Sequence, residues 1–245
     1  MANSVFGVAA LPDTDTGTVN GPTVTFSNPP IASMAAGDIV VVAVCYRGTG
    51  VTVTNSATGG QTWTSHTNLD DTTSLTGRVF TCKFDGTWTA APAFTVTAGT
   101  NLMSATMYVI RGADQTTWLD AAVVNTDVAG APTTMTLTGI TTATDGALVV
   151  AFWFMSDNNT VGTFTSGFDG NANAAGDDQN RNSTTFGASA AWKIFATAGA
   201  TGDIVAEQLT LGGDASIGFV VAIRPAAGGI SIPVFMHAYN QMRAS

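Results

Sequence analysis

Short apolar and polar runs alternate along this chain, and two of the longer runs are apolar without interruption. They are Ile39–Tyr46 and Ala147–Met155, and each follows a Gly/Asp pair, Gly37-Asp38 in the first case and Asp145-Gly146 in the second. A short apolar run that is bounded by turn residues is typical of a strand buried on both faces. We therefore expect these two runs to be the central strands of two β-sandwich lobes.

Shorter runs rich in Val and Thr surround the first central run, and turn signals such as Asp85-Gly86 separate them. Their spacing is that of a β-sandwich. The strands predicted for the first half of the chain are 23–26, 39–46, 51–54, 61–64, 77–84, 93–97 and 102–111.

The same order of runs begins again about 110 residues later, which is the size of one small β-sandwich. The strands predicted for the second half are 135–138, 147–155, 162–165, 186–195 and 216–224. The predicted fold class is therefore all-β, with two tandem, quasi-repeated antiparallel β-sandwich lobes of the jelly-roll or immunoglobulin-like type. Extended N- and C-terminal arms flank the two lobes.

The predicted division is an N-terminal arm (1–21), a first lobe (22–112), a connecting segment (113–132), a second lobe (133–225) and a C-terminal arm (226–245). The N-terminal residues are interpreted as an extended arm or as an edge strand. The connecting segment contains Trp118-Leu119 and Val123-Val124, so we expect it to pack between the lobes.

Two apolar features must be buried against some other part of the protein or against a partner, because the predicted strands alone do not bury them. The uninterrupted central runs need their outer faces covered, either by the sister lobe or by another subunit. The C-terminal arm carries apolar residues after two glycines, and it needs a groove on the same chain or on a partner.

Charged residues are scarce, at 10% of the chain with a net charge of −9, whereas about 25% is usual. Solubility must then depend on Thr, Ser, Asn and Gly, which suits a protein that packs against copies of itself. The eight basic residues are scattered, so we expect no nucleic-acid partner and no membrane partner. No Lys or Arg precedes Arg47, so no secretion signal is expected.

Cys45 and Cys82 both lie in strand-like runs, and Trp63 lies between them, as in immunoglobulin domains that carry a disulfide. The interval between these two cysteines is shorter than that pattern requires. We expect two buried free thiols rather than a disulfide across two strands.

No motif in the sequence indicates catalysis or cofactor binding, so we predict a non-enzymatic protein with no catalytic, cofactor-binding or metal-binding residues. His66 and His237 stand alone, and there is no Gly-x-Ser-x-Gly motif. The loop at 169–180 begins like a calcium-binding EF-hand loop, but Ala174 and Asn180 replace the Gly and Glu that such a loop needs. A calcium site and a solvated acidic loop are the two interpretations of this loop.

The tryptophans offer a different chemistry, because an exposed indole can stack on a sugar ring. We interpret them mainly as core residues, since most lie in strand-like runs. They are Trp63, Trp88, Trp118, Trp153 and Trp192. A glycan-cleaving enzyme would need two carboxylates that face each other across a cleft, and it is the third alternative.

Four segments resemble β-sandwich proteins encoded by bacteriophages and prophages. They are Ala-Gly-Asp-Ile-Val-Val-Val at 36–42, Gly-Gly-Gln-Thr-Trp-Thr at 59–64, Val-Ile-Arg-Gly-Ala-Asp at 109–114 and Asp-Gly-Ala-Leu-Val-Val at 145–150. The resemblance covers residues 22–225 and implies a virion structural protein of the capsid-decorating, head-fibre or tail type. Its motifs are structural, so it implies no functional residues.

We therefore expect a structural component of a bacteriophage virion that forms a homo-oligomer and is assembled in the cytoplasm of the bacterial host. Its expected partners are copies of itself and other virion proteins, without a cofactor. The alternative is a carbohydrate-binding or adhesive β-sandwich module on a phage or cell surface, with tryptophans on one sheet face as the binding platform.

Overall fold

The structure of this chain, a computed structural model, describes residues 2–11, 23–99, 101–128, 130, 133–157, 161–164, 167–168, 179–183, 186–208 and 214–227. These residues form antiparallel strands and no helix, so the predicted all-β class is confirmed. The C-terminal arm beyond residue 227, including His237, lies outside the described residues. The proposed calcium loop at 169–180 does so as well, apart from the backbone of its last two residues.

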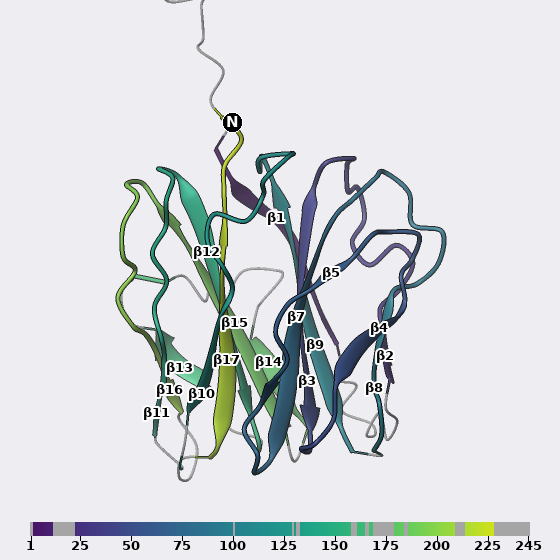
Figure 1. Cartoon of the computed structure of the whole chain (residues 1–245), viewed down its shortest axis with the longest axis vertical. Helices are drawn as coiled ribbons and strands as arrows, with labels where there is room; N and C mark the ends of the chain where they lie inside the picture. The colour runs from purple at the N-terminus through teal and green to yellow at the C-terminus, as the bar shows by residue number, and fades with distance from the viewer. Residues whose placement is uncertain are drawn as a thin grey trace, which may run out of the picture.

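Four antiparallel sheets are stacked side by side in four layers (Figure 1). The first lobe has a six-stranded sheet in the order β1-β9-β3-β7-β5, with β6 also paired to β7, and a three-stranded sheet in the order β2-β8-β4. These strands are β1 (Ser4–Leu11), β2 (Thr23–Thr25), β3 (Ile39–Arg47), β4 (Val53–Ala57), β5 (Thr64–Ser65), β6 (Leu69–Asp70), β7 (Leu75–Lys83), β8 (Ala93–Val96) and β9 (Met103–Arg111).

The second lobe has a five-stranded sheet in the order β10-β17-β12-β15-β14 and a three-stranded sheet in the order β11-β16-β13. Its strands are β10 (Val124–Val128), β11 (Thr134–Leu137), β12 (Ala147–Met155), β13 (Val161–Phe164), β14 (Gln179–Ser183), β15 (Phe186–Phe195), β16 (Ile204–Gln208) and β17 (Ser216–Ile223). Replacing β1, β9, β3, β7 and β5 by β10, β17, β12, β15 and β14 turns the first large sheet into the second. The small sheets correspond in the same way, so the repeat predicted from the sequence is present in the topology.

Most long strands lie where the apolar pattern predicts them, and β12 and β15 have the predicted bounds. The predicted strand at 61–64 is wrong, because only its last residue belongs to β5 and the rest is a loop. The sequence analysis also missed β10, β14 and β16, of which β10 pairs with β17 in the sheet of the second lobe. Structurally, the second lobe therefore begins within the predicted connecting segment.

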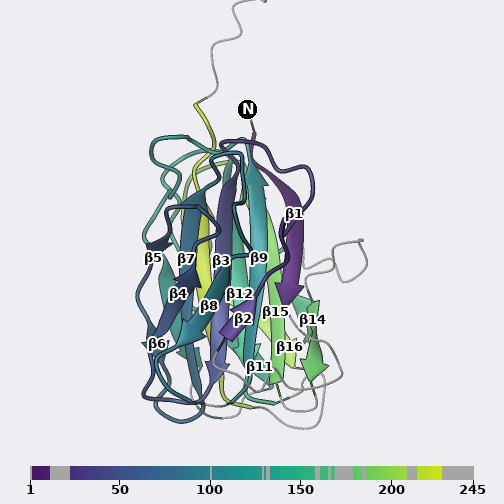
Figure 2. The same ribbon diagram turned by 90° about the vertical axis from the view of Figure 1, so that its right-hand side faces the viewer.

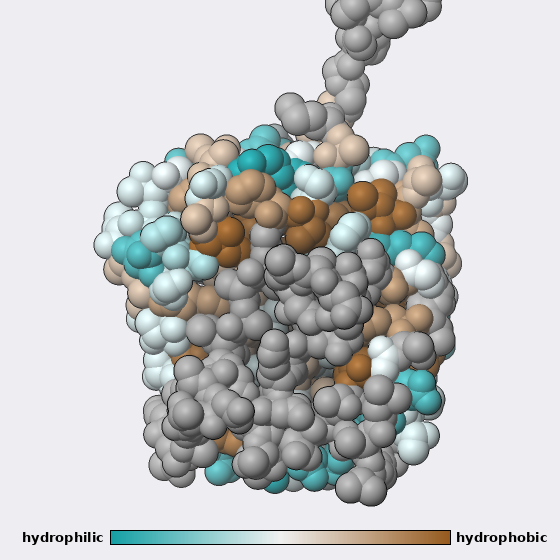
Figure 3. All heavy atoms as spheres, turned by 180° about the vertical axis from the view of Figure 1, so that it is seen from behind, coloured by the Kyte–Doolittle hydropathy of each residue, from teal (hydrophilic) through white to brown (hydrophobic). Residues whose placement is uncertain are grey.

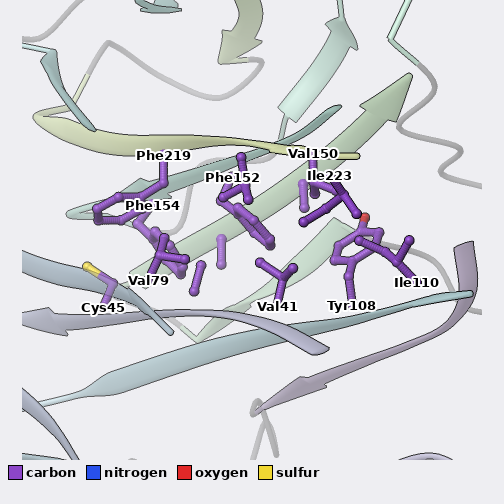
Figure 4. Close-up of a cluster of buried hydrophobic side chains, with 14 of the residues drawn as sticks. Val41, Cys45, Val79, Tyr108, Ile110, Val150, Phe152, Phe154, Phe219 and Ile223 are labelled. Carbon is purple, nitrogen blue, oxygen red and sulfur yellow. The ribbon is translucent and has the colours of Figure 1, made fainter. Parts of the chain in front are cut away.

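The two large sheets face each other across a seam between the lobes. Side chains from both sheets point toward one another there (Figure 4); they include Val41, Cys45, Val79, Tyr108 and Ile110 from the first lobe and Val150, Phe152, Phe154, Phe219 and Ile223 from the second. Strand β7 contacts β17 across the seam, and β9 contacts β15. The repeat exchanges these two contacts, as a two-fold axis between the lobes would.

Each large sheet also packs its opposite face against the small sheet of its own lobe. Val40, Val42 and Val44 of β3 enter the core of the first lobe, and Val149, Ala151 and Trp153 of β12 enter that of the second. Both central strands are therefore buried on both faces, which explains their uninterrupted apolar sequence. The second face of each central strand is therefore buried by the sister lobe of the same chain, and not by another subunit.

The structure also decides between the alternatives for the N-terminal residues, the connecting segment and the two cysteines. Residues Ser4–Leu11 form edge strand β1, paired with β9, rather than a free arm. Trp118, Leu119 and Val123 pack against the seam, so the connecting segment lies between the lobes as expected. Cys45 and Cys82 are buried free thiols on opposite faces of the same sheet, Cys45 in the seam and Cys82 in the first core.

A cleft at the open side of the first lobe

A cleft of about 470 Å³ lies at the side of the first lobe, where the edges of its two sheets separate. Edge strand β4 of the small sheet forms one wall, and strand β5 with the loop before it forms the other; β4 and β5 can be located in Figures 1 and 2. The residues that line the cleft are Thr54, Asn55, Thr58, Gln61, Thr62, Trp63, Ser65, Arg78 and Phe80. They include no carboxylate, His or Cys, so the arrangement is suited to binding rather than to acid–base chemistry.

The loop at 58–63 is built around two glycines and one buried glutamine. Gly59 and Gly60 have φ values of 65° and 91°, which only glycine adopts without strain. A β-carbon at Gly59 would also lie 2.6 Å from the ring of Trp88. The Gln61 amide donates to Asp85 Oδ1 (3.1 Å) and to Thr87 O (2.9 Å) and accepts from Asp85 N (3.0 Å). These bonds fix the loop to the turn after β7.

Trp63 follows this loop and forms an aromatic wall of the cleft. Its indole Nε1–H donates to Thr58 O over 2.9 Å, which satisfies the polar end of the ring within the protein. The ring packs edge-on against Phe94, with centroids 5.4 Å apart, and lies at a tilt beside Trp88 at 6.3 Å. Trp63 is only partly buried, so these contacts hold an accessible indole in a fixed orientation.

Arg78 of β7 crosses the floor of the cleft above the ring of Phe80, with the guanidinium carbon 5.7 Å from the ring centroid. Its Nε–H donates to His66 O, its Nη1 to Val53 O (3.0 Å) and its Nη2 to Ser65 Oγ (3.1 Å). The side chain thus ties β4 to β5 across the gap between the sheets. Burial lowers the pKa of Arg78 from its ordinary value, because the charged form loses hydration.

Asn55 and His66 complete the surroundings of the cleft. The Asn55 amide donates to Ala57 O (3.0 Å) and Ala93 O (2.9 Å), where β4 shifts its register against β8. His66 shares a 3.1 Å hydrogen bond between its Nε2 and Thr81 Oγ1. Burial and then the charge of Arg78 lower the pKa of His66, so its imidazole is neutral at pH 7.

A second, smaller hollow of about 190 Å³ lies on the other side of β5, between the first lobe and the connecting segment. It is lined by Thr64, Thr81, Thr116, Thr117, Trp118 and Leu119. Successive residues of a strand point to opposite faces, so Thr64 faces this hollow while Ser65 faces the cleft. Two tryptophans, Trp63 and Trp118, therefore face hollows on either side of one short edge strand.

Three of the other tryptophans serve the fold. Trp88 and Trp153 are buried core residues, and Trp192 packs against the seam, as the core interpretation predicts. Within the part of the chain that the structure describes, no group of three His, Cys, Asp or Glu side chains is placed to hold a metal ion. No helix that could cross a bilayer occurs among the described residues.

Sequence reasoning considered Trp63 and missed its neighbours. Asn55 and Arg78 reach the cleft from different strands, and no short motif connects their positions. The Gly-Gly-Gln-Thr-Trp-Thr segment was the available signal, since it now forms the loop wall. Comparison of the chain with protein-family models, with curated proteins and with solved structures gave no match. The resemblance to phage proteins therefore stays a prediction.

Proposed function

We propose that this chain is a non-enzymatic structural component of a bacteriophage virion, which assembles with copies of itself and with other virion proteins. The observation that carries the proposal is the open edge of β1. This strand pairs with β9 over Ser4–Leu11, and among the described residues no strand pairs with its other side. A long edge without charge or proline is a template for strand addition by another chain.

The other edges of the two large sheets are better protected against such pairing. Strands β5 and β6 have two residues each, β10 carries Asp127, and the sequence of β14 is polar with a central Arg181. Short length and charge are the usual protections of an edge, and β1 has only a register shift between Val5 and Gly7. The exception among the four edges is therefore the one suited to assembly.

The rest of the described surface exposes few large apolar side chains. Figure 3 shows the side that carries β1 and β14, and the described part of it mixes hydrophilic residues with separate apolar patches. Among the described residues, Ile194 is the one exposed large apolar side chain, at 39% exposure. Assembly through backbone pairing at an edge does not need a large apolar face.

Two proline variants of β1 test the proposal. Backbone N–H groups of neighbouring residues in an edge strand point alternately toward the partner strand and outward. Of Ala9→Pro and Ala10→Pro, one therefore removes an outward N–H and leaves the pairing with β9 intact. We expect that variant to keep its thermal unfolding midpoint and to lose self-association, measured by sedimentation velocity at micromolar concentration.

A monomeric parent chain at that concentration, or an oligomer indifferent to both prolines, would contradict assembly through β1. Mass spectrometry of purified phage particles tests the virion assignment separately. The chain should occur there in many copies, and its absence from particles would exclude the assignment whatever the oligomeric state.

A further inference from the structure

The cleft beside Trp63 has the features of a preformed ligand site. Its volume of about 470 Å³ lies within the usual range for small-molecule sites, about 300–1,000 Å³. Its lining is one indole and one phenyl ring among seven polar side chains, which is a mixture that suits a ligand with both C–H and hydroxyl faces. Sugar rings have this character, because axial C–H groups form an apolar face and hydroxyl groups form the rim.

The indole of Trp63 is held ready for such a ring. Its N–H is already bonded to Thr58 O, and Phe94 and Trp88 fix its plane. A ligand that packs on this ring does not have to order it, which lowers the entropic cost of binding. The hydroxyls of Thr54, Thr62 and Ser65 lie around the cleft as donors or acceptors for a polar rim.

Arg78 favours a sugar that carries a negative charge. A guanidinium has five N–H donors, and three of those of Arg78 have acceptors in the described protein, all of them neutral oxygens. The ion pairs among the described residues are Arg111–Asp38 and Arg224–Asp120, so Arg78 has no carboxylate partner there. Its lowered pKa agrees with a cation whose charge is not balanced. A carboxylate on the ligand would supply the missing counter-charge and accept the remaining N–H groups.

We propose that this cleft binds a uronic-acid-type sugar unit of a polysaccharide, with the sugar ring on Trp63 and its carboxylate on Arg78. The site requires only the first lobe and does not depend on assembly through β1. The protein could fail to associate with itself and still bind the sugar, so the two proposals fail separately.

An array of oligosaccharides tests the proposal, with uronic-acid-containing members and neutral members of matching length as the probes and the full chain as the analyte. We expect binding to the acidic members at least about tenfold tighter than to the neutral ones, since one charge-assisted pair contributes this much. The preference should shrink as salt rises from 0.05 to about 0.5 M, because screening weakens ion pairs at accessible sites. No binding anywhere on the array, or tighter binding of neutral members, would overturn the proposal.

Three variants locate the site. Trp63→Ala should weaken binding of the best acidic oligosaccharide at least about tenfold, and Trp63→Phe should weaken it less, because a smaller aromatic face remains. Trp118→Phe is the matched control, since it alters the indole on the other side of β5, and it should bind like the parent chain. Equal losses in Trp63→Phe and Trp118→Phe would contradict a site at Trp63.

Arg78→Lys keeps the charge but loses the guanidinium fork, so it should weaken binding of acidic sugars more than binding of neutral sugars. Because Arg78 also ties β4 to β5, each variant is first compared with the parent by its thermal unfolding midpoint. The salt dependence of the parent chain needs no variant, so it decides the role of charge even if Arg78→Lys does not fold.

Discussion

The two lobes place a carboxylate at the same point of the fold, but they take it from different parts of the chain. In the first lobe, Arg111 at the end of β9 forms a bidentate pair with Asp38 (2.8 and 2.7 Å), and Asp38 also accepts from Ala35 N (2.8 Å). In the second lobe, Arg224 follows β17 and pairs with Asp120 (3.2 Å) of the connecting segment. Asp120 accepts from Ala143 N (2.6 Å) and Thr144 N (3.2 Å), and Thr144 corresponds to Ala35, because Ala147 N donates to Thr144 O as Asp38 N donates to Ala35 O.

The difference follows from the residue after a glycine that both lobes share. Gly37 and Gly146 correspond, since their N–H groups donate to Phe84 O and Phe195 O over 2.8 Å. Ala147 therefore occupies the position that corresponds to Asp38, while Asp145 accepts from Ala198 N (2.7 Å). The second lobe thus depends on the connecting segment for a carboxylate that the first lobe supplies itself. A repeat can conserve a contact without conserving the residue that makes it.

Removing the two carboxylates is the strongest way to break this comparison. The Asp120 side chain is fully buried and bonds to Arg224 and to the N–H groups of Ala143 and Thr144. Asp120→Ala therefore removes the acceptor of all three groups. We expect a loss of about 2–4 kcal/mol of unfolding free energy by urea titration, less than for a fully buried pair because the arginine is partly exposed.

Asp38→Ala should cost less, about 1–2 kcal/mol, because Arg111 keeps its bond to Ser33 O and its contact with the ring of Phe6. Asp203→Ala, which removes an exposed carboxylate of the second lobe, is the control and should stay within about 0.5 kcal/mol of the parent. A larger loss for Asp38→Ala than for Asp120→Ala would contradict the dependence of the second lobe on the connecting segment.

The seam gives the second comparison, because equivalent positions carry Gly77 in β7 and Ala188 in β15. A β-carbon at Gly77 would lie 2.9 Å from both Ile217 Cδ1 and Phe219 Cζ, across the seam. We expect Gly77→Ala to lower the unfolding free energy by about 1–3 kcal/mol through overpacking. If Gly77→Ala is neutral or stabilising in urea titration, the seam is looser than this packing requires.

Ala188→Gly is the reciprocal change, since it removes a β-carbon that the seam already accommodates. It should cost about 1 kcal/mol, from lost contact and from the greater freedom of glycine in the unfolded chain. If Gly77→Ala destabilises the chain and Ala188→Gly stabilises it, the two halves of the seam do not correspond.

Asp71, which directly follows β6, links the stability of the first lobe to pH. Burial acts to raise the pKa of Asp71, but the N–H groups of Leu75, Ser74 and Thr73 and the Ser74 hydroxyl outweigh it, and the pKa is lowered. A lowered pKa contributes stability above the unfolded value of about 3.9, and that stability is lost as pH falls through the folded value. Asp71→Asn should therefore cost about 1–2 kcal/mol at pH 7 and progressively less below pH 4. A loss that is constant between pH 7 and pH 3 would contradict this role.

The sequence predicted the elements whose evidence is local and missed strands that depend on pairing with another strand of the same lobe. Uninterrupted apolar runs located β3 and β12, because burial on both faces leaves no polar positions. Edge strand β10 lies in the predicted connecting segment, and β14 begins within the loop considered at 169–180. Pairing with β17 and β15, and not their own residue pattern, makes these segments strands. For the cleft, the sequence offered Trp63 among five tryptophans, but a core and a binding interpretation differ only in exposure. Arg78 could not be found, because its lack of a counter-charge is a property of the folded chain.

Asp127 of β10 is expected to have the smallest effect on stability, and its pKa shifts in the opposite direction from that of Asp71. Burial and then the charge of Asp71 raise the pKa of Asp127, the opposite direction from Asp71 itself. The folded state then holds its proton more tightly, so stability falls as pH rises through the unfolded and then the folded pKa. Asp127→Asn should stabilise the chain at pH 7 by less than about 0.5 kcal/mol, because Asp127 is exposed, and should change nothing at pH 3. The gain should shrink when Asp71→Asn is already present, and a gain independent of Asp71 would show that the two carboxylates do not interact across the seam.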